Sequence, residues 1–371
     1  MNIAQISYYY LPVRGGQEVY IQNLQGILKA QGFRSLVYQP NRGVKSDDVV
    51  VVPRLPLIGR IIPFSAHHLF NWTLKWMYGR RAQEADVIIV HYAFFAKSVW
   101  NLRKKVIVLS HGIEWNLDRK SHYDRYCEAI GRASFDRFII VANDTHYFRH
   151  FGLQIEPGKG FFKEVAPGKW FIPNCVDTSV FKKNEGLADL IPKQAVLVPR
   201  QITRDRGIDL AIRAFSLFNH LQAGYTLVIL GQVPKNEKRY LSSCKDLVHT
   251  LGLDQQVIFL GPVQNHQMPE YYSSAALTLI PTLRREGTSL SALESMACGT
   301  PTVSTNVAGL ADLPTVQAEP TPESIAQQMC LTIENRERIA LEQAGTVSRV
   351  FNLENWRNAW LQVINQAGSR L

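Results

Sequence analysis

The chain has 371 residues, 46% of them hydrophobic and 19% charged, a balance typical of a folded globular protein with room for two domains. The net charge of +10 lies wholly in residues 1–185, which carry 25 Lys and Arg against 15 Asp and Glu, whereas residues 186–371 carry 16 of each. No charge-free apolar stretch reaches about 18 residues, and the first residues lack a secretion signal, so we expect neither a membrane-spanning helix nor export.

Strand-like apolar runs alternate with helical patterns along the whole chain. Strands are predicted near residues 2–8, 34–39, 86–91, 105–110 and 137–142, and again near 195–199, 226–230, 256–260, 276–281 and 301–305. Such alternation favours parallel sheets covered by helices on both faces. Two series, one in each half, predict an α/β protein with two doubly wound domains.

The predicted boundary is a stretch rich in proline, asparagine and charge. We expect an N-terminal domain over residues 1–173, a linker over 174–194 and a C-terminal domain over 195–353. Residues 354–371 form an amphipathic helix that we expect to pack back on the first domain. Ligands of open α/β sheets bind at the carboxyl ends of the strands, so the residues there are the candidates for a site.

The first such candidate is the loop "LPVRGGQEVY". Gly15 and Gly16 follow the first strand and precede a helix, where glycine lets the backbone approach a ligand closely. A Gly-Gly pair also occurs in ordinary turns, so the pattern alone leaves a structural role open.

Residues 54–81 combine basic and aromatic side chains, and no acidic residue occurs between Val49 and Gln83. Basic residues interleaved with Trp72 and Trp76 suit a surface that rests on anionic lipid. The alternative is an ordinary core helix with a polar edge. No nucleic-acid-binding motif accompanies this positive charge, so we expect no nucleic-acid partner.

Two histidines follow neighbouring predicted strands. His91 ends the run "VIIVH", and His111 ends the run "VIVLSH". Either can contact a ligand at the edge of the sheet, and either can instead be a structural residue with its ring bonded internally.

A basic loop opens the second domain. In "VLVPRQITRDRGIDLAIRAF", Arg200 and Arg206 lie between a strand and a helix. Two fixed guanidiniums there can neutralise a diphosphate leaving group. A solvated basic loop is the alternative.

The stretch "REGTSLSALESMACGTP" holds two glutamates eight positions apart. Glu286 precedes a helix that we expect to begin near Ser289 and Leu290, and Glu294 lies on that helix. The unpaired N–H groups of its first turn favour a phosphate, while the two carboxylates can accept hydrogen bonds from sugar hydroxyls. Unrelated surface charges are the alternative.

Several other chemistries have no support in the sequence. Gly-x-Gly-x-x-Gly, a P-loop, a Gly-x-Ser-x-Gly elbow and an Asp-x-Asp pair are all missing. The five cysteines are dispersed without a C-x-x-C pair, which indicates reduced thiols of a cytosolic protein. We therefore expect no metal and no resident cofactor.

The ordered set of motifs resembles the signature of glycosyltransferase family 4. The set comprises "GGQE" after the first strand, "IPNCVD" at the boundary, "PRQ...RDRGIDLAIRAF", the Glu-x7-Glu pair and "SMACGTPTVSTNVAGLADL". The resemblance implies the GT-B fold, in which two Rossmann-like domains face each other across a cleft. It also implies a nucleotide-sugar donor in the C-terminal domain and an acceptor in the N-terminal one.

The resemblance also assigns roles to individual residues. It implies that Glu286 contacts the donor sugar, Glu294 the ribose, and Arg200 and Arg206 the diphosphate. Gly16 corresponds to the glycine of the family's first loop, which faces the phosphates. His111 matches the histidine near the donor sugar better than His91 does.

Five positions depart from the family pattern. Pro199 and Cys175 each stand where glycine is usual, and Thr288 and Ser289 replace an aromatic-Gly pair. Arg206 stands where the family usually has lysine, which keeps the charge and changes its geometry. Proline has no N–H, so the phosphate loop must bind without that donor.

The reading that follows is a retaining, metal-independent hexosyltransferase that uses a UDP- or GDP-linked sugar. The expected acceptor is a hydroxyl of a glycan or lipid-linked molecule in cell-surface glycan or glycolipid synthesis. The expected location is the cytoplasm, at the inner face of the membrane. The alternative is a catalytically silent, sugar-nucleotide-binding subunit of a glycosyltransferase complex.

Overall fold

The computed structural model describes residues 1–13, 15–53, 65–78, 84–102, 106–117, 121–184 and 190–369. Packing divides the chain into two compact units. Unit 1 comprises Met1–Ile155, Gly160–Pro173 and Trp356–Leu371, and unit 2 comprises Glu156–Lys159 and Asn174–Asn355. Each unit is described by itself. Asn174, the first residue of the predicted linker, packs within unit 2.

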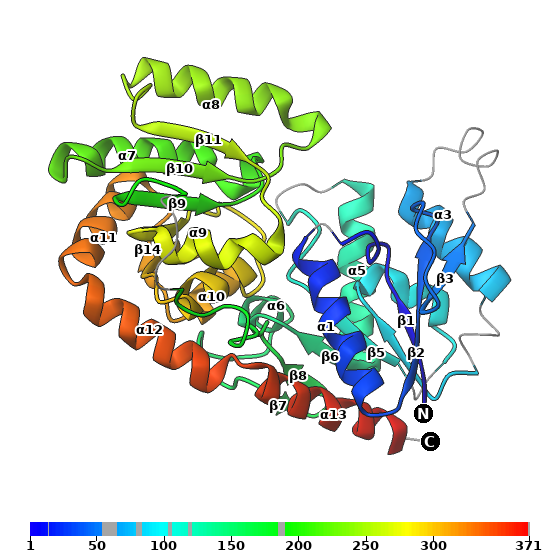
Figure 1. The fold of residues 1–371 in the computed structure, drawn as a ribbon. Coiled ribbons are helices and arrows are strands. Elements are labelled where there is room, and N and C mark those ends of the chain that lie inside the picture. Colours follow the sequence, from blue (N-terminus) through cyan, green and yellow to red (C-terminus); the bar gives the residue numbers. More distant parts are fainter. Residues whose placement is uncertain are drawn as a thin grey trace. The chain divides into compact units, whose positions relative to one another are not determined.

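The sheet of unit 1 has eight strands in the order β3-β2-β1-β4-β5-β6-β8-β7, drawn in the blue to green ribbons of Figure 1. Its paired strands run parallel except β7 and β8, which are antiparallel. In chain order the elements are β1 (Asn2–Ile6), α1 (Gly16–Ala30), β2 (Arg34–Pro40), β3 (Val49–Val52), α3 (Ala66–Thr73), η1 (Leu74–Tyr78), β4 (Val87–Val90), η2 (Ala93–Val99), β5 (Val106–Ser110), α5 (His122–Arg137), β6 (Ile139–Ala142), α6 (Thr145–His150), β7 (Lys163–Ala166), β8 (Lys169–Phe171) and α13 (Leu353–Ser369).

The sheet of unit 2 has six parallel strands in the order β11-β10-β9-β12-β13-β14. Its elements are β9 (Ala195–Pro199), η3 (Arg204–Arg206), α7 (Ile208–Leu221), β10 (Thr226–Leu230), η4 (Lys235–Glu237), α8 (Lys238–Thr250), β11 (Val257–Gly261), η5 (Asn265–Gln267), α9 (Met268–Ser274), β12 (Leu277–Ile280), α10 (Leu290–Ala297), β13 (Thr302–Thr305), η6 (Ala308–Asp312), β14 (Val316–Ala318), α11 (Pro322–Glu334) and α12 (Arg336–Val350).

All ten predicted strands are present, with ends that shift by at most two residues. Four strands were not predicted from the sequence, namely β3, β7, β8 and β14. Each has only three or four residues, which is too few for a clear periodic pattern. The central strands were easiest to predict because they are apolar throughout. Every residue of β4, β5, β6 and β9 is buried, as expected for parallel strands covered on both faces.

The first six strands of each unit are arranged in the same order in the two sheets. In each, the first strand of the unit lies between the second and the fourth, so the winding direction reverses beside it. These switch points, between β1 and β4 and between β9 and β12, are where doubly wound sheets bind ligands. The residues that follow these four strands are therefore the first place to look for a site.

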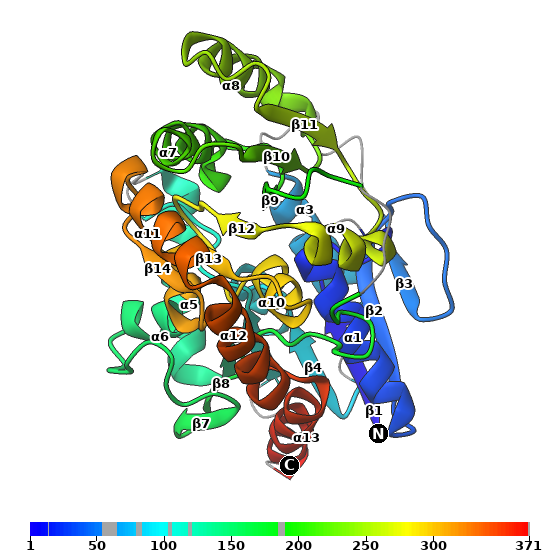
Figure 2. The ribbon, with the colours of Figure 1, turned by 60° about the vertical axis from the view of Figure 1, so that its left-hand side comes forward.

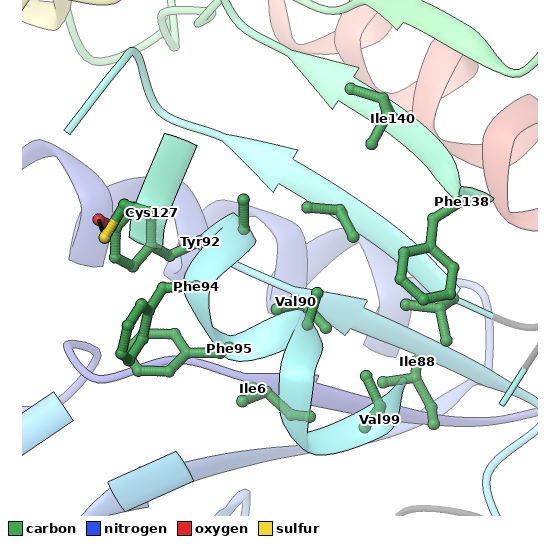
Figure 3. Packing of buried hydrophobic residues seen from close by; sticks show 14 of the residues in the cluster. Ile6, Ile88, Val90, Tyr92, Phe94, Phe95, Val99, Cys127, Phe138 and Ile140 are labelled. Atoms are coloured by element: carbon green, nitrogen blue, oxygen red, sulfur yellow. Dashed lines mark hydrogen bonds between the residues drawn. The ribbon is translucent and has the colours of Figure 1, made fainter. Parts of the chain in front are cut away.

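One face of the unit 1 sheet packs against aromatic residues of η2. Figure 3 shows Phe94 and Phe95 of this short helix in one cluster with Ile6, Ile88 and Val90 of the strands, where Ile88 lies beside Val99 at the other end of the helix. On the opposite face, α1 and α13 meet through a hydrogen bond of 2.9 Å from the Trp360 indole N–H to the Tyr20 hydroxyl. Trp356 and Trp360 are fully buried, so the C-terminal helix is part of the unit 1 core.

The two faces of the unit 2 sheet differ in chemistry. Alternate side chains such as Val196, Val198 and Leu277 form an apolar core with α7, α8 and α11. The opposite face meets α10 and α12 through hydroxyl and amide groups, for example between Ser295 and Thr278 at 2.8 Å. Figure 2 shows α7 beside α11, and α10 beside α12. The polar face is the one that carries α10 and hence the predicted donor site.

Among the described residues, no helix has both the length and the apolar character needed to span a bilayer.

Candidate active site

The switch point of unit 2 brings two predicted segments together. Arg200 directly follows β9, and the loop that contains Glu286 follows β12. Since β9 and β12 are paired parallel strands, both segments leave the sheet at the same edge. Two of the predicted site residues, 86 positions apart in the sequence, thus become neighbours.

The Glu286 carboxylate is held between two arginines. Its Oε2 accepts from Nη2 of Arg200 and pairs with Nη1 of Arg206. The hydroxyl of Thr282 lies 3.1 Å from Nη2 of Arg200 and 3.4 Å from the same carboxylate oxygen. Three of the four residues for which the sequence predicts a catalytic role therefore form one cluster in unit 2.

The two arginines bring positive charge into a largely buried site. Burial lowers the pKa of Arg200 to about 10. Burial, together with repulsion from Arg200, lowers the pKa of Arg206 to about 9. Both guanidiniums stay protonated near neutral pH, so one carboxylate faces two cations. Nε of Arg200 is buried and has no hydrogen-bond partner, so the cluster does not satisfy this side chain completely.

Two glycines that the sequence analysis did not single out allow this cluster to close. Gly207 ends the turn after Arg206 with φ of +65°, and a Cβ there would lie 2.0 Å from the Pro281 carbonyl oxygen. A Cβ at Gly231 would lie 2.0 Å from the carbonyl oxygen of Arg200. Any side chain at either position would push apart the loops that carry the arginines and the glutamate. In the sequence, the feature that could have pointed to Gly207 is its position directly before the residues of α7.

The N-terminus of α10 lies beside the same arginine. Ser289 is the N-cap residue, yet its side chain does not cap the helix. Instead, its hydroxyl accepts a hydrogen bond of 3.2 Å from Nη1 of Arg200. Leu290 is the first helical residue. The first turn therefore keeps N–H groups without a side-chain cap next to a cation, an arrangement that favours an anion.

Glu294 lies one turn further along α10 and is buried, with 8% of its surface exposed. Its Oε2 accepts a hydrogen bond of 2.9 Å from the Tyr272 hydroxyl of α9. Burial raises the pKa of Glu294 to about 7, although the bond from Tyr272 opposes this. A carboxylate that is this reluctant to ionise would be stabilised by further hydroxyl donors. Tyr272 belongs to no motif and was therefore not predicted from the sequence.

In unit 1, Gly15 and Gly16 form the start of α1. Gly15 is the N-cap, with φ of −152°, and it supplies no side-chain cap. The Glu18 carboxylate lies near it, because a Cβ on Gly15 would be 3.2 Å from Oε2 of Glu18. Gln17 connects this turn to the loops after β1 and β4, with Nε2 lying 3.3 Å from Oγ of Ser7 and 3.5 Å from the His91 carbonyl.

His91 and His111 are neighbours at the carboxyl ends of β4 and β5. Nδ1 of His91 lies 3.3 Å from Nε2 of His111, and the two ring planes differ by 11°. His91 is fully buried, and its Nε2 lies 2.7 Å from Oε1 of Gln5. Burial holds the pKa of His91 well below its usual range and lowers the pKa of His111 to about 3. Both rings are therefore neutral near neutral pH.

The two histidines differ in what they can reach. His111 is partly exposed, whereas His91 is enclosed. Tyr20 packs edge-on against His111, with ring centroids 4.9 Å apart. His111 is thus the one of the two that a ligand can touch, and His91 lies behind it.

Three of the positions that depart from the family pattern lie in or beside unit 2 loops: Cys175 after the unit 1 sheet, Pro199 at the end of β9 and Thr288 before α10. Thr288 accepts a hydrogen bond of 2.7 Å at its hydroxyl from the Asn174 backbone N–H, and its carbonyl accepts another from the Asn174 side chain. Cys175 is buried. Pro199 ends β9 and pairs with Leu230. The start of the predicted linker is therefore fixed to the loop that precedes α10.

Half of the basic and aromatic stretch 54–81 lies outside the described residues. Of the part that is described, Trp72 is 49% exposed and Trp76 is 70% exposed, with ring centroids 6.3 Å apart. Lys75 is exposed as well. Phe70, in contrast, is buried in the core of unit 1. The described segment thus contributes both to the core and to an exposed aromatic surface.

Within the described part of the chain, no three His, Cys, Asp or Glu side chains are grouped as metal ligands would be. The four catalytic candidates fall into the two units, with Arg200, Arg206 and Glu286 in unit 2 and His111 in unit 1.

Two family models match this chain. The model described as Glycosyltransferase Family 4 matches residues 14–154, and the one described as Glycosyl transferases group 1 matches residues 188–337. Mannosylfructose-phosphate synthase of Agrobacterium fabrum is 33% identical over 80% of this chain and 72% of its own. Two further relatives match over only 33% and 14% of their own lengths.

Solved structures share the fold. Sucrose-phosphate synthase of Thermosynechococcus elongatus superposes with a TM-score of 0.80, at 18% identity and with 98% of both chains covered. HepE of Anabaena, in complex with UDP, superposes with a TM-score of 0.76 at 16% identity, over 98% of this chain and 100% of its own. The two parallel α/β units therefore have the GT-B fold, as the motifs imply.

Proposed function

The chain belongs to glycosyltransferase family 4, and from this premise we propose that it is a retaining, metal-independent hexosyltransferase. The proposed donor is a UDP- or GDP-linked hexose, and the proposed acceptor is a hydroxyl of a glycan or lipid-linked molecule. We further propose that the product belongs to the glycans or glycolipids of the cell surface. No resident cofactor takes part, since the nucleotide sugar is itself a substrate.

The observation that carries this proposal is the cluster at the unit 2 switch point. The buried guanidinium of Arg200, the partly exposed one of Arg206 and the uncapped first turn of α10 offer positive charge and N–H donors in one place. Such a place suits a diphosphate. On this proposal Ser289 and Leu290 supply the turn, and Glu294 accepts from the ribose hydroxyls. HepE, of the same fold, was solved in complex with UDP, which supports a nucleotide as the ligand.

Glu286 pairs with both arginines that a diphosphate would need. Both guanidiniums contact the same oxygen of its carboxylate. We propose that the incoming diphosphate takes over the two arginines and releases Glu286, which then accepts from hydroxyls of the donor sugar. The exchange avoids leaving the buried Arg200 and the neighbouring Arg206 without a counter-charge at any stage.

The proposed chemistry follows from what the cluster can stabilise. The bond between C1 of the sugar and the diphosphate oxygen breaks with its electron pair, and Arg200, Arg206 and the α10 turn stabilise the resulting charge. The acceptor oxygen attacks C1 from the same face, so the configuration is retained. Its proton passes to an oxygen of the departing diphosphate. The family resemblance is the support for the proposed roles of Gly15 and Gly16 toward the phosphates and of His111 toward the sugar.

The proposed acceptor surface belongs to unit 1, where the excess positive charge of the sequence lies. Trp72, Trp76 and Lys75 give the described part of stretch 54–81 the character of a membrane-surface segment. We propose that the enzyme rests on the cytoplasmic face of an anionic membrane, where a lipid-linked acceptor would lie. Flotation with anionic vesicles at low salt tests this, and protein that stays at the bottom of the gradient removes the membrane from the proposal.

A thermal-shift screen of UDP, GDP, ADP and their hexose derivatives tests the donor site, with Glu294→Ala beside the native protein. A ligand at a hundredfold excess over its Kd stabilises the folded state by about 2.7 kcal/mol. We expect one base to raise the melting temperature and Glu294→Ala to lose that response. No response to any nucleotide would refute the donor site.

Donor hydrolysis separates the enzyme from the silent subunit. The observation that favours the alternative is Pro199, which has no N–H to offer to a phosphate beside Arg200. A silent subunit would bind a nucleotide sugar and release no nucleoside diphosphate, whereas a transferase releases it with water or acceptor. Binding without release would therefore move the assignment to the silent subunit.

A further inference from the structure

Unit 1 contains a chain of hydrogen bonds whose direction is fixed at one end. The carbonyl oxygen of Ser35 can only accept, and Nε2 of Gln25 donates to it at 3.5 Å. The oxygen of the Gln25 amide therefore faces the other way, where it accepts from Nε2 of Gln5 at 3.1 Å. Nε2 of Gln5 also donates to the Ser35 hydroxyl at 3.0 Å. Two acceptors thus set the orientation of the Gln5 amide.

This orientation determines which nitrogen of His91 carries the proton. With its NH₂ group used, Gln5 presents Oε1 to His91, 2.7 Å from Nε2. An oxygen acceptor requires Nε2 to be protonated. His91 is fully buried and neutral, so its other nitrogen, Nδ1, is an acceptor.

The protonation of His91 in turn determines which nitrogen of His111 carries the proton. Its Nε2 lies 3.3 Å from Nδ1 of His91, and the near-parallel ring planes allow a bond in the plane of both rings. Because Nδ1 of His91 can only accept, Nε2 of His111 must carry the proton. A neutral ring then leaves a lone pair on Nδ1 of His111, which makes no hydrogen bond within the described chain. The side chain is partly exposed, so this lone pair is available to a ligand.

We propose that Gln5 and His91 are positioning residues that hold His111 in its Nε2–H tautomer, so that Nδ1 can accept a hydrogen bond from a sugar hydroxyl. The inference rests on the proposed function. The neutral tautomer also suits the chemistry, because a sugar that loses its leaving group develops positive charge. A protonated ring beside that charge would oppose it, whereas a lone pair does not.

Nitrogen NMR of the protein labelled with ¹⁵N-histidine reads the tautomer directly, and His111→Asn assigns the signal. We expect Nε2 of His111 to be protonated and Nδ1 to be bare near pH 7. A signal from an Nδ1–H or a doubly protonated ring would overturn the inference. This measurement uses the native chain without substrate, so it does not depend on any activity.

Kinetics with matched variants tests whether the tautomer matters. Gln5→Leu removes the acceptor that orients His91, whereas Ser35→Ala removes one bond to the same amide and leaves its oxygen facing His91. The probe is the best of UDP-glucose, GDP-mannose and ADP-glucose in the thermal-shift screen. We expect Gln5→Leu to mix the His111 tautomers and to lower kcat/KM for donor turnover by about tenfold, the size of one lost hydrogen bond.

Control measurements distinguish a failure of the positioning role of Gln5 and His91 from a failure of the proposed function. Binding of the free nucleoside diphosphate should be unchanged in Gln5→Leu, because its proposed site is in unit 2. Ser35→Ala should retain both the tautomer and the turnover. Mixed tautomers with unchanged turnover would overturn the role of Gln5 and His91. A native protein that turns over no donor, yet shows the expected tautomer, would refute the proposed function and leave the hydrogen-bond chain intact.

Discussion

The first six strands of the two units have the same order, yet one switch point is charged and the other is neutral. Unit 2 places Arg200, Arg206 and Glu286 in ion-pair contact, whereas unit 1 places the neutral side chains of Gln5, His91 and His111 there. The distribution of net charge runs the other way. The first half of the sequence carries the whole excess of +10, and the second half is balanced.

The contrast shows that the net charge of a region does not predict the charge at its candidate site. Net charge describes what the surface attracts, while the site depends on a few side chains that the sheet edge brings together. A diphosphate needs concentrated cations, which unit 2 has. A sugar hydroxyl beside developing positive charge needs a neutral acceptor, which unit 1 has. Each prediction below tests one side of this contrast.

The largest effect should come from removing a cation in unit 2. Arg200→Ala deletes a charge that contacts Glu286 and would stabilise the leaving diphosphate. We expect kcat for donor turnover to fall by about 10² to 10³, the usual loss for one donor to a developing anion. Steady-state release of the nucleoside diphosphate measures it.

Arg204→Ala is the matched control for that variant. Arg204 begins the same turn as Arg206, but it stacks on the Tyr240 ring, 5.2 Å from its centroid, away from Glu286. Its loss should leave kcat within a few-fold. Equal losses in both variants would mean that the loop as a whole, and not the charge at Arg200, is needed.

The second effect is on stability and depends on pH. Burial raises the pKa of Glu294 from 4.5 to about 7. The folded protein therefore binds a proton more tightly than the unfolded chain, and the free energy of unfolding falls as pH rises from about 4.5 to 7. The total is about 3 kcal/mol. Glu294→Gln cannot ionise, so it should be more stable than the native protein by about that amount near pH 8.

Urea unfolding at several pH values measures this difference. Near pH 4 the two proteins should unfold at similar urea concentrations, because Glu294 is then neutral in both states. Glu270→Gln, on the same helix as Tyr272 and partly exposed, serves as control and should show no such trend. If Glu294→Gln were less stable at pH 8, the carboxylate would be ionised and well solvated in the folded protein.

Much of the fold could be predicted from the sequence because its strands are unambiguous. Apolar runs such as "VIIV" and "AVLVP" are buried along their whole length, so their existence and spacing stand out. The pair β7 and β8 could not be predicted in this way. "KEVA" is polar and "KWF" has three residues, and their antiparallel pairing depends on contacts that no local pattern encodes.

The candidate site likewise contains residues that the sequence predicts and residues that it does not. Motif residues such as Arg200 and Glu286 could be predicted because each follows a clear strand. Their partners could not, since Thr282, Tyr272 and Gly231 belong to no motif and act through distances set by the folded chain. The direction of the His91–His111 chain is a further example. It depends on Gln25 and Ser35, which are far from both histidines in the sequence.

The third prediction concerns nucleotide affinity, and the direction of the change tells whether Glu286 exchanges with the diphosphate at the two arginines. If Glu286 competes with the diphosphate for the two arginines, Glu286→Gln should bind a free nucleoside diphosphate more tightly, by about tenfold or 1.4 kcal/mol. Its donor turnover should fall, because the sugar loses a charged acceptor. Titration calorimetry with UDP or GDP measures the first change.

Asp205→Asn controls for charge in the same region. Asp205 pairs with Arg285 at 3.2 Å, but both side chains are more than one third exposed, so the pair contributes little. Its loss should leave nucleotide affinity nearly unchanged. Weaker binding in Glu286→Gln would show that Glu286 preorganises the arginines for the phosphate and does not compete with it.

The smallest effect concerns the basic surface of unit 1. Lys75 is exposed between Trp72 and Trp76, and one basic residue near an anionic membrane contributes about 1 kcal/mol. Lys75→Ala should therefore bind anionic vesicles about fivefold more weakly at low salt, and the difference should vanish at high salt because charges are screened. Lys238→Ala, exposed on α8 of unit 2, should bind like the native protein. Equal losses from the two lysines would mean that the vesicles respond to total charge, and that the excess in the first half of the chain marks no particular surface.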